Sequence, residues 1–359
     1  MGKTVCFLLS GRLCNPVGGH KIVYQYANAL ADRGHRVLIV NNIFRPSALP
    51  WYIESSRKVY SFFRNVYRSI RRENSCRRWF ELKPGVIEMQ VWTYDVKSMP
   101  AADYYVATNA LTAPYLLDYR VQDSHKFYFI QGYESWLVGE EELTRTFHYP
   151  YKKIVISEWL RKKLADVSED AIVIPSGYDN DRFSLDIPIT DKEKLSLSIL
   201  YHEMPEKNFS MGLEVIDKVK TLYPDLKVFV FGVYPRPSCL PDWCDYYQSP
   251  DAKTHNHINN VASIYLGTSS NEGLGLTVLE AMVCGQAVVC TDIDGYKEVA
   301  KHNETALLSP VGDAHQMAEN VIRLIEDDGL RMRLAATANE RIKLYSAANG
   351  CRSFSSLFD

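Results

Sequence analysis

Two carboxylates and two glycines stand close together in the second half of the chain. Glu272 is followed by Gly273 and Gly275, and Glu280 comes eight residues after Glu272. A predicted strand ends just before them, and 276–284 predicts a helix. The first amides of a helix have no intrahelical partner, so this glycine turn predicts an anion-binding site. The flanking carboxylates suit a ligand with a central diphosphate and hydroxyl-bearing rings at both ends.

Polar residues also follow two predicted strands in the first half of the chain. Asn109 comes shortly after the strand 104–107, and Tyr133 and Glu134 come shortly after the strand 127–130. Open α/β sheets bind ligands at the carboxyl ends of their strands, which makes these three residues candidates for ligand binding. Glu134 is either a base or a member of a structural ion pair.

The metal-ligating residue types are not arranged in a strong metal motif. Asp292 and Asp294 have D-x-D spacing, but they follow a predicted buried strand, where a turn with a helix cap is the alternative. The eight cysteines include no CxxC pair and no Cys/His ligand cluster. We therefore expect no metal, no disulfide framework and a reducing, cytoplasmic setting.

Short apolar runs alternate with helical patterns and must position these residues. The run 5–9 is followed by a glycine-containing loop, a helix that ends at Gly34 and a second run at 36–40, which together make a βαβ unit. Because the runs are continuous, we predict parallel strands covered on both faces. The other predicted strands are 86–91, 104–107, 127–130, 154–156, 172–174, 197–201, 226–231, 262–266 and 287–291.

The predicted strands fall into two sets on either side of the polar segment 186–196. A chain of 359 residues exceeds the size at which one hydrophobic core stops growing. We therefore predict two α/β Rossmann-like domains, 1–185 and 197–339, which face each other across a cleft. The residues from about 340 to 359 are expected to form a helix that packs back on the first domain.

Composition excludes several classes of protein. The chain is 46% hydrophobic and 23% charged, which is ordinary for a folded domain and excludes disorder. Its net charge of -2 gives no global basic field, so nucleic acid is not an expected partner. Its apolar runs all fall well short of the roughly eighteen residues needed to cross a bilayer.

One segment, 57–78, is strongly basic. It carries eight Lys or Arg residues and one Glu, a net charge of +7. Apolar residues recur within it at helical spacing, which predicts a basic amphipathic helix. Such a helix either lies on an anionic membrane surface or packs on the first sheet with its arginines solvated. The first alternative places the protein peripherally on the inner face of the cell membrane.

The segment 272–280 resembles the E-x7-E signature of retaining GT-B glycosyltransferases. The surrounding Glu-Gly-x-Gly-Leu and Glu-Ala-Met-x-x-Gly-x-x-Val-Val strings are similar to family 4 in particular. The likeness continues in the glycine pair before the first helix, in Ile-Pro-Ser-Gly-Tyr-Asp at 174–179 with Phe183, and at 305–309. The resemblance implies a GT-B fold and transfer of a sugar from a nucleotide diphosphate-sugar.

The resemblance also implies roles for individual residues, and it makes Asn109, Tyr133 and Glu134 candidates for the acceptor side, where Glu134 would be the base. Glu280 is expected to accept hydrogen bonds from the nucleotide ribose and Glu272 from the transferred sugar. Lys207 fits a cation that the family places beside the diphosphate, whereas His202 stands where arginine is usual. For two pairs of donor-binding candidates a structural role is the alternative: residues 248–249 could form an ordinary loop, and the glycines at 18–19 could simply end a strand. The remaining donor-binding candidates are Gly273, Leu274, Gly275, Leu276, Thr277, Gln248, Ser249, Gly18 and Gly19.

The implied chemistry is front-face displacement, in which the leaving phosphate helps to deprotonate the incoming hydroxyl. It needs no cofactor and no metal, and its acceptor is a glycan or lipid-linked molecule, with bacterial cell-surface polysaccharide or glycoconjugate synthesis as the expected setting. The alternatives are a nucleotide-sugar epimerase, a phosphorylase and a non-catalytic nucleotide-sugar binding protein. An NAD oxidoreductase fits less well, because the loop 11–19 lacks G-x-G-x-x-G.

Overall fold

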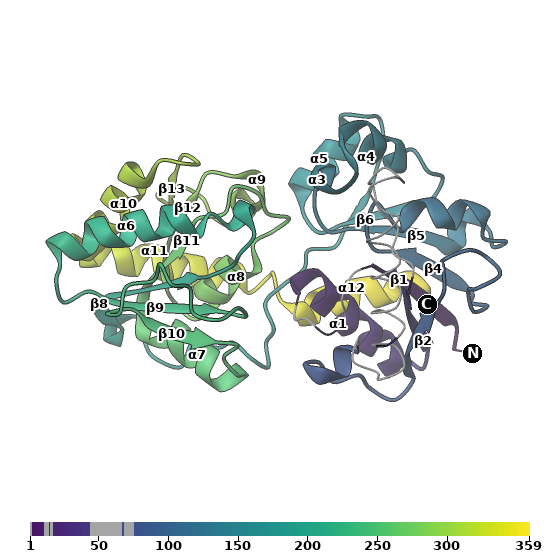
Figure 1. Ribbon diagram of the computed structural model, residues 1–359, viewed down its shortest axis with the longest axis horizontal. Coiled ribbons are helices and arrows are strands. Elements are labelled where there is room, and N and C mark those ends of the chain that lie inside the picture. Colours follow the sequence, from purple (N-terminus) through teal and green to yellow (C-terminus); the bar gives the residue numbers. More distant parts are fainter. Residues whose placement is uncertain (1, 11–13, 15–16, 44–66, 68–74) are drawn as a thin grey trace. The chain divides into compact units, whose positions relative to one another are not determined.

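The computed structural model describes residues 2–10, 14, 17–43, 67 and 75–359. Its ribbon divides into two compact α/β units (Figure 1). The first unit contains residues 1–175 and 350–359, and the second contains residues 176–349. Most of the basic segment, including 57–66 and 68–74, lies outside the described residues, so the amphipathic helix stays a prediction.

The first unit is built on a seven-stranded parallel sheet in the order β3-β2-β1-β4-β5-β6-β7. Every residue from Val5 to Leu9 of β1 is fully buried, as expected of a central parallel strand covered on both faces. The strands are β1 (Thr4–Leu9), β2 (Arg36–Asn42), β3 (Val86–Val91), β4 (Tyr104–Ala107), β5 (Lys126–Ile130), β6 (Lys152–Val155) and β7 (Ile172–Val173).

A helix from the end of the chain completes the core of the first unit. The ring of Phe354 in α12 (Ala347–Ser355) stacks on that of Tyr26 in α1, with centroids 4.3 Å apart, and the two helices lie side by side in Figure 1. Phe358 packs against Phe127 at 5.0 Å. The other helices are α1 (Gly18–Asp32), α3 (Ser135–Val138), α4 (Glu140–Phe147) and α5 (Glu158–Ala165).

The second unit contains a six-stranded parallel sheet in the order β10-β9-β8-β11-β12-β13. All six residues of β11 are buried. The strands are β8 (Glu193–Leu200), β9 (Lys227–Gly232), β10 (Asp245–Gln248), β11 (Ala262–Gly267), β12 (Ala287–Thr291) and β13 (Ala306–Ser309).

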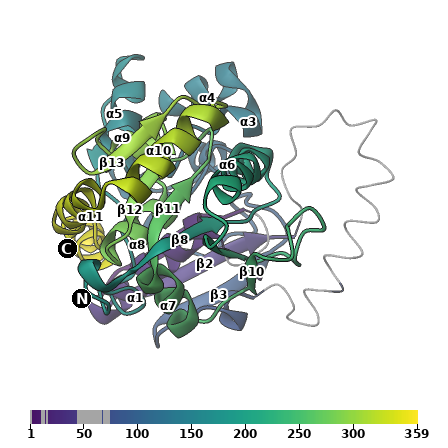
Figure 2. The ribbon, with the colours of Figure 1, turned by 90° about the vertical axis from the view of Figure 1, so that its left-hand side faces the viewer.

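Helices cover both faces of the second sheet. α6 packs against α10, and α8 packs against α11 on the other face of the strands (Figures 1 and 2). Val215 of α6 and Leu324 of α10 are fully buried in one apolar cluster with Val289 of β12. The helices are α6 (Phe209–Leu222), α7 (Ala252–Val261), α8 (Leu276–Val283), α9 (Asp294–Lys297), α10 (Ala314–Glu326) and α11 (Asp328–Ile342).

Each sheet has a point at which its strand order reverses. β1 pairs with β2 on one side and β4 on the other, and β8 pairs with β9 and β11 in the same way. The chain therefore leaves the ends of β1 and β4, and of β8 and β11, in opposite directions. Ligands of open α/β sheets bind at the carboxyl ends of such strand pairs.

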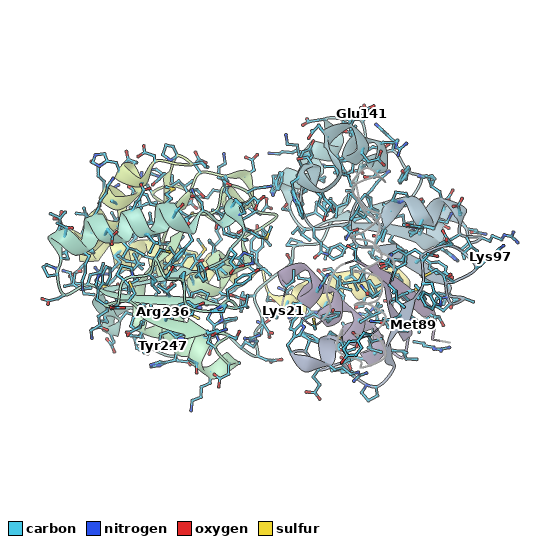
Figure 3. All side chains as sticks on the ribbon, in the orientation of Figure 1. Lys21, Met89, Lys97, Glu141, Arg236 and Tyr247 are labelled. Carbon is cyan, nitrogen blue, oxygen red and sulfur yellow. The ribbon has the colours of Figure 1, made fainter. Side chains whose placement is uncertain are left out.

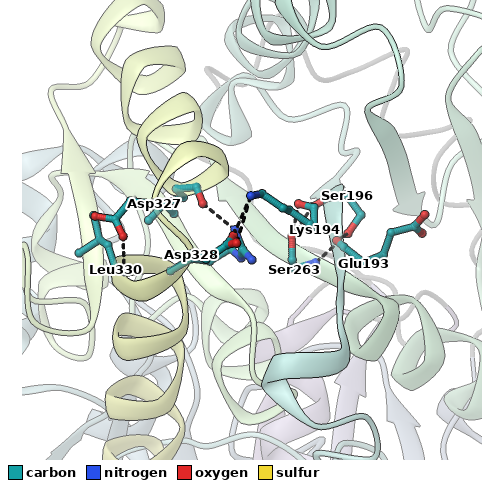
Figure 4. Close-up of polar contacts among 9 residues, drawn as sticks. Glu193, Lys194, Ser196, Ser263, Asp327, Asp328 and Leu330 are labelled. Atoms are coloured by element: carbon teal, nitrogen blue, oxygen red, sulfur yellow. Dashed lines mark hydrogen bonds and ion pairs between the residues drawn. The ribbon is translucent and has the colours of Figure 1, made fainter.

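The amino ends of β8 and β11 are held by polar contacts to α11 and to each other (Figure 4). Lys194 Nζ lies 3.1 Å from an Asp328 carboxylate oxygen at the start of α11. Ser263 Oγ of β11 donates to Lys194 O of β8 at 2.9 Å. Asp327 caps α11 by accepting from Leu330 N at 2.8 Å. These contacts fix one end of the strand pair, and the opposite end carries the candidate site.

The strands predicted from apolar runs are all confirmed, with small shifts at their ends. β10 and β13 were not predicted; β10 begins and ends with an exposed residue, whereas β13, Ala306–Ser309, is a mostly buried apolar run of the kind that predicted the other strands. The polar segment 186–196 lies within the second unit and includes the start of β8. Asn260 Oδ1 of α7 accepts hydrogen bonds from Asp186 N at 2.7 Å and Ile187 N at 3.1 Å, so this polar stretch is bound to the domain.

Lys192, just before β8, makes the stability of the second unit depend on pH. The residue is buried, and its Nζ donates to Asn259 O at 3.1 Å and to Asn260 O. Burial lowers the pKa of Lys192 from 10.5 to about 8. Between these values the unfolded chain holds the proton more tightly than the folded protein does. The free energy of unfolding should therefore rise with pH, by up to about 1.4 kcal/mol per unit from this group.

Urea unfolding at pH 7.5, 9 and 10 tests this expectation by comparing the wild type with Lys192→Met. The difference in unfolding free energy between the two should change across this range, because only the wild type has the buried amine. Lys218→Met, at an exposed position of α6, is the matched control and should follow the wild type at every pH. Identical pH dependence for all three proteins would contradict the assignment.

Candidate functional site

Lys207 and Glu272 form an ion pair across the switch point of the second sheet. Lys207 ends the 3-10 helix Pro205–Lys207 after β8, and Glu272 lies in the loop after β11. Lys207 Nζ is 2.5 Å from Glu272 Oε1, and the side chains are 22% and 14% exposed. A pair this sheltered is screened by salt much less than a pair on the open surface. The structure thus brings together two residues that lie far apart in the sequence.

Neighbouring side chains fix both loops. Ser269 Oγ donates to Glu272 Oε1 at 2.8 Å, and Ser269 is itself buried. Thr268 Oγ1 donates to Lys207 O at 2.8 Å. Ser270 N donates to Glu206 O at 2.7 Å, which joins the two loops through their backbones. Consequently the Lys207 and Glu272 side chains meet without either loop having to rearrange.

Two glycines let the loop of Glu272 pack against α9. Gly275 has φ +78°, and a Cβ atom there would lie 2.4 Å from the ring of Tyr296. A Cβ atom at Gly295 would lie 2.2 Å from Glu272 O. The predicted glycine turn is therefore present, and a second glycine that the sequence analysis did not select is needed for the same loop.

Glu280 lies on α8, close to the same buried tyrosine as Glu272. The pKa of Tyr265 in β11 is raised chiefly by burial, and the charges of Glu272 and Glu280 raise it further, while a hydrogen bond with the Thr277 side chain lowers it. Both carboxylates therefore lie near the Tyr265 hydroxyl. Leu274 is buried beneath the turn, and Glu280 is partly exposed.

The amino end of α8 presents backbone amides between these carboxylates. Val278 N donates to Gly275 O at 3.0 Å as the first turn of the helix closes. The amides of Leu276 and Thr277 precede it and occupy the positions at which a helix has no backbone acceptor of its own. This end of α8 attracts negative charge.

His202 lies near the ion pair, and its surroundings favour the neutral form of its ring. Its Nδ1 accepts a hydrogen bond from Met204 N at 3.0 Å. Burial lowers the pKa of His202, and the charge of Lys207 lowers it further, against opposing effects of Glu272 and Glu206. His202 therefore supplies no fixed positive charge at the position where the resemblance leads one to expect an arginine.

The other predicted residues of the second unit lie apart from this cluster. Gln248 ends β10 and Ser249 follows it, both exposed, and β10 is two strands away from β8. Ser249 N donates to Gly232 O at 2.7 Å. Figure 3 labels Tyr247 and Arg236 on this side of the unit, where Arg236 donates to Pro241 O at 2.7 Å and holds the loop before β10.

Both carboxylates of the D-x-D segment form ion pairs with one lysine. Lys297 Nζ lies 3.1 Å from Asp292 Oδ1 and 3.4 Å from Asp294 Oδ1. Across the described parts of the chain, His, Cys, Asp and Glu side chains form no group of three placed to hold a metal ion. Within those same parts, no helix combines the length and apolar character needed to cross a bilayer.

The first unit gathers polar groups at its own switch point. Asn109, after β4, donates through Nδ2 to the Ser10 hydroxyl after β1. Ala110 N donates to Glu134 Oε2 at 2.8 Å, and burial raises the pKa of Glu134 to about 7. Gly18 and Gly19 are the first residues of α1. A Cβ atom at Gly19 would lie 3.1 Å from the Gln131 side-chain oxygen after β5.

Tyr133 does not join this group. Its hydroxyl donates to Glu140 of α4, and the Lys163 amine lies 5.5 Å from the centre of its ring. The Glu134 carboxyl group accepts from a backbone amide and forms no ion pair among the described residues. The two adjacent residues thus have different surroundings, although both follow β5.

Comparison with known proteins places the second unit in a sequence family. Residues 179–341 match the family described as Glycosyl transferases group 1. The phosphatidyl-myo-inositol mannosyltransferase of Mycolicibacterium smegmatis is 27% identical over 205 residues, covering 54% of this chain and 53% of the relative. One component of the human phosphatidylinositol N-acetylglucosaminyltransferase is 24% identical over 323 residues, covering 85% of this chain and 65% of that protein. The second unit of the chain therefore resembles the group 1 glycosyltransferases in sequence.

Similarity to solved structures shows that the chain has the GT-B fold. The sucrose-phosphate synthase of Thermosynechococcus elongatus has a TM-score of 0.70 and 15% identity, over 99% of this chain and 98% of that chain. Anabaena HepE in complex with UDP-glucose has a TM-score of 0.70 and 13% identity, over 99% of both chains. The chain spans about half the length of the curated mannosyltransferases that it matches.

Sequence reasoning missed several residues of the candidate site. Ser269 and Ser270 lie in the loop after β11, as Glu272 does, so their position after a predicted strand was a usable signal. Tyr296 had no such signal, because its contact with Gly275 joins segments separated by a buried strand. Ser10 could have been found as the polar residue that ends the first apolar run.

Replacing Gly295 by alanine should displace the Glu272 loop. The added Cβ atom would overlap the Glu272 carbonyl, and overpacking of this kind costs about 1–3 kcal/mol. Gly329→Ala is the matched control, because its Cβ atom would meet only Asp327 Oδ1 at an ordinary 3.4 Å in α11. Thermal unfolding should show a clear loss for Gly295→Ala and no loss for Gly329→Ala. Equal melting temperatures for the two variants would contradict the described loop packing.

Proposed function

We propose that the protein transfers a sugar from a nucleotide diphosphate-sugar to a hydroxyl group of a glycan or lipid-linked acceptor. The transfer retains the anomeric configuration and uses no metal ion or other cofactor. The observation that supports this most is the Lys207–Glu272 pair beside the amino end of α8, with Glu280 on the same helix. A cation, free amides and two carboxylates match the charges and hydroxyl groups of such a donor.

The donor is held by the second unit. Lys207 and the amides of Leu276 and Thr277 neutralise the diphosphate, because they combine a full positive charge with the positive end of a helix. Glu272 accepts hydrogen bonds from the transferred sugar, and Glu280 accepts them from the ribose. Gln248 and Ser249, at the end of β10, contact the nucleotide base.

Catalysis rests on stabilising the leaving diphosphate. As the bond between the anomeric carbon and the phosphate oxygen breaks, negative charge grows on that oxygen beside Lys207 and the α8 amides. The acceptor oxygen bonds to the anomeric carbon on the same face, and its proton passes to the leaving phosphate. No protein nucleophile is consumed in this scheme, so positioning and charge supply the rate enhancement.

The acceptor is held by the first unit. Asn109 and Glu134, with the glycine pair of α1, provide amide, carboxyl and backbone groups that suit hydroxyl groups. The names of two relatives include phosphatidyl-myo-inositol or phosphatidylinositol, which supports a membrane lipid or lipid-linked glycan as the acceptor class. We place the protein in the cytoplasm, at the inner face of the membrane, in cell-surface glycan or glycolipid synthesis.

The neutral state of His202 favours one second candidate. Without a fixed cation at this position, the site can bind a nucleotide diphosphate-sugar and yet stabilise the leaving group too weakly for transfer. The protein would then be a nucleotide-sugar binding protein without turnover. This candidate and the transferase differ in one observable, the release of nucleoside diphosphate.

A panel of UDP-, GDP- and ADP-sugars tests the proposal. At least one sugar nucleotide should raise the melting temperature of the protein and be slowly hydrolysed. When a lipid-linked acceptor is added, its sugar should be transferred to the acceptor. Excess EDTA should leave the rate of transfer unchanged. NMR of the product at early times should show the anomeric configuration of the donor. Protection without nucleotide release would favour the binding protein, and EDTA-sensitive turnover restored by magnesium would refute the metal-free scheme.

Glu280→Ala should weaken binding of the nucleoside diphosphate that protects the wild type in this panel. A hydrogen bond to a charged group contributes about 1.5–3 kcal/mol, so the dissociation constant should rise at least about tenfold. Titration calorimetry measures the change, and Glu214→Ala, an exposed carboxylate on α6, is the control. A folded Glu280→Ala variant with wild-type affinity would remove Glu280 from the ribose site.

A further inference from the structure

The imidazole ring of His202 is held by a backbone amide of its own loop. His202 is the second residue after β8, a central strand of the sheet that carries the candidate site. Its Nδ1 accepts a hydrogen bond from Met204 N at 3.0 Å. A backbone amide can only donate, so Nδ1 carries a lone pair and the hydrogen of the neutral ring lies on Nε2. This contact therefore selects one tautomer of His202.

The Nε2 edge of the same ring is left for another partner. Nδ1 and Nε2 lie on different edges of an imidazole, so the Nε2–H group points away from the Met204 amide. Among the residues that the structure describes, no group accepts a hydrogen bond from Nε2. The ring of Tyr234, after β9, meets that of His202 in a T-shaped contact, with centroids 5.0 Å apart and an interplanar angle of 85°. His202 thus has an oriented ring with one N–H group available to a ligand.

The surroundings of His202 and its contact with Met204 both oppose protonation of the ring. Burial lowers the pKa of His202, and the charge of Lys207 lowers it further, whereas Glu272 and Glu206 act in the opposite direction. Protonation would also place a hydrogen on Nδ1, facing the Met204 N–H group, and that hydrogen bond would be lost. A bound diphosphate favours the cation, because it brings negative charge. The Met204 contact and Lys207 are the groups that can keep the ring neutral in a complex.

We infer that His202 is a catalytic residue that acts as a neutral hydrogen-bond donor: its Nε2–H group binds an oxygen of the donor diphosphate, while Met204 N keeps Nδ1 unprotonated before and after the ligand binds. The inference rests on the proposed function. As the bond to the anomeric carbon breaks, negative charge grows on the phosphate oxygen, and hydrogen bonds to ionised acceptors are stronger than those to neutral ones. No proton joins or leaves His202, so the full positive charge beside the diphosphate comes from Lys207.

Two variants of similar shape test the role of the Nε2–H group. In His202→Gln the side-chain nitrogen takes the place of Nε2 and donates without carrying a charge. In His202→Asn the side-chain oxygen takes the place of Nδ1 and accepts from Met204 N, but no donor reaches the position of Nε2. A hydrogen bond to a charged group is worth about tenfold or more in affinity. His202→Gln should therefore bind UDP and UDP-glucose at least about tenfold more tightly than His202→Asn.

Titration calorimetry measures these affinities, with UDP and UDP-glucose or with the matched pair that best protects the wild type in the nucleotide-sugar panel. His315→Asn makes the same chemical change at an exposed position of α10, where the side chain is 76% exposed, and is the matched control. Its affinities should equal those of the wild type. An equal loss in His202→Gln and His202→Asn would contradict a neutral donor, because both variants remove the ability to carry a charge.

Proton uptake tests the charge of the ring in the complex. Calorimetry at pH 7.5 in buffers of different ionisation enthalpy counts the protons taken up as UDP binds. At this pH the ring is neutral in the free protein, because its pKa lies below the ordinary range of histidine. The wild type and His202→Gln should take up the same number of protons, since any protonation of UDP itself is common to both.

His202→Arg gives an independent readout and keeps the inference testable if the other two variants fail to fold. Arginine brings a permanent charge to the position where the resemblance leads one to expect it. If the wild-type ring is neutral in the complex, this charge should raise the affinity for UDP about tenfold at low salt. The gain should shrink at high salt, because the added charge is screened. An affinity equal to that of the wild type at both salt concentrations would show that the ring is already charged.

The outcomes distinguish the inference from the function on which it rests. If neither UDP nor any sugar nucleotide of the panel binds the wild type, the proposed function is wrong. If they bind, and the wild type takes up a proton that His202→Gln does not, only the inference is overturned. Wild-type affinity in both His202→Gln and His202→Asn would overturn it as well, because the diphosphate would then make no contact with His202.

Discussion

The close approach of two loops at the switch point of the second sheet is the constraint on which the candidate site depends. β8 and β11 are neighbours, and the loops after them are joined by Ser270 N to Glu206 O and by Thr268 Oγ1 to Lys207 O. These short contacts set the separation at which Lys207 reaches Glu272. The charge arrangement is therefore a product of the backbone and is held in place before a ligand arrives, which is what electrostatic catalysis requires.

The first unit has the same reversal of strand order, but different side chains lie at it. Ser10 and Asn109 meet across the point where its strand order reverses, and Glu134 lies beside them with a raised pKa. Hydroxyl and amide groups both donate and accept, so this edge suits hydroxyl groups, whereas the edge with Lys207 and the α8 amides suits an anion. This contrast supports a donor on the second unit and an acceptor on the first.

Much of the fold was predictable, because buried parallel strands are continuous apolar runs and glycine turns are local. The segment around Glu272 and Glu280 could be placed on a strand, turn and helix for the same reason. The short strand β10 could not be predicted, since an edge strand with exposed ends has no apolar run. Likewise the polar stretch 186–196 reads as a linker, yet Asn260 binds its backbone to α7, a contact between segments some seventy residues apart.

The contacts that complete the site are the least predictable part. Tyr296 beneath Gly275, and the Gly295 position against Glu272 O, depend on how α9 packs, and no local pattern encodes that packing. The charge state of His202 also depends on tertiary surroundings, because burial and Lys207 lower its pKa. Resemblance identified Lys207 and Glu272 separately, while their pairing emerged only in three dimensions.

A crystal structure of the protein with a bound, non-hydrolysable nucleotide diphosphate-sugar tests the central claim most directly. The account predicts that Lys207 Nζ leaves Glu272 and lies within hydrogen-bond distance of the diphosphate, that Glu272 accepts from sugar hydroxyls, and that the diphosphate meets the amides of Leu276 and Thr277. A ligand bound elsewhere, or one bound at α8 with the Lys207–Glu272 pair intact, would contradict it.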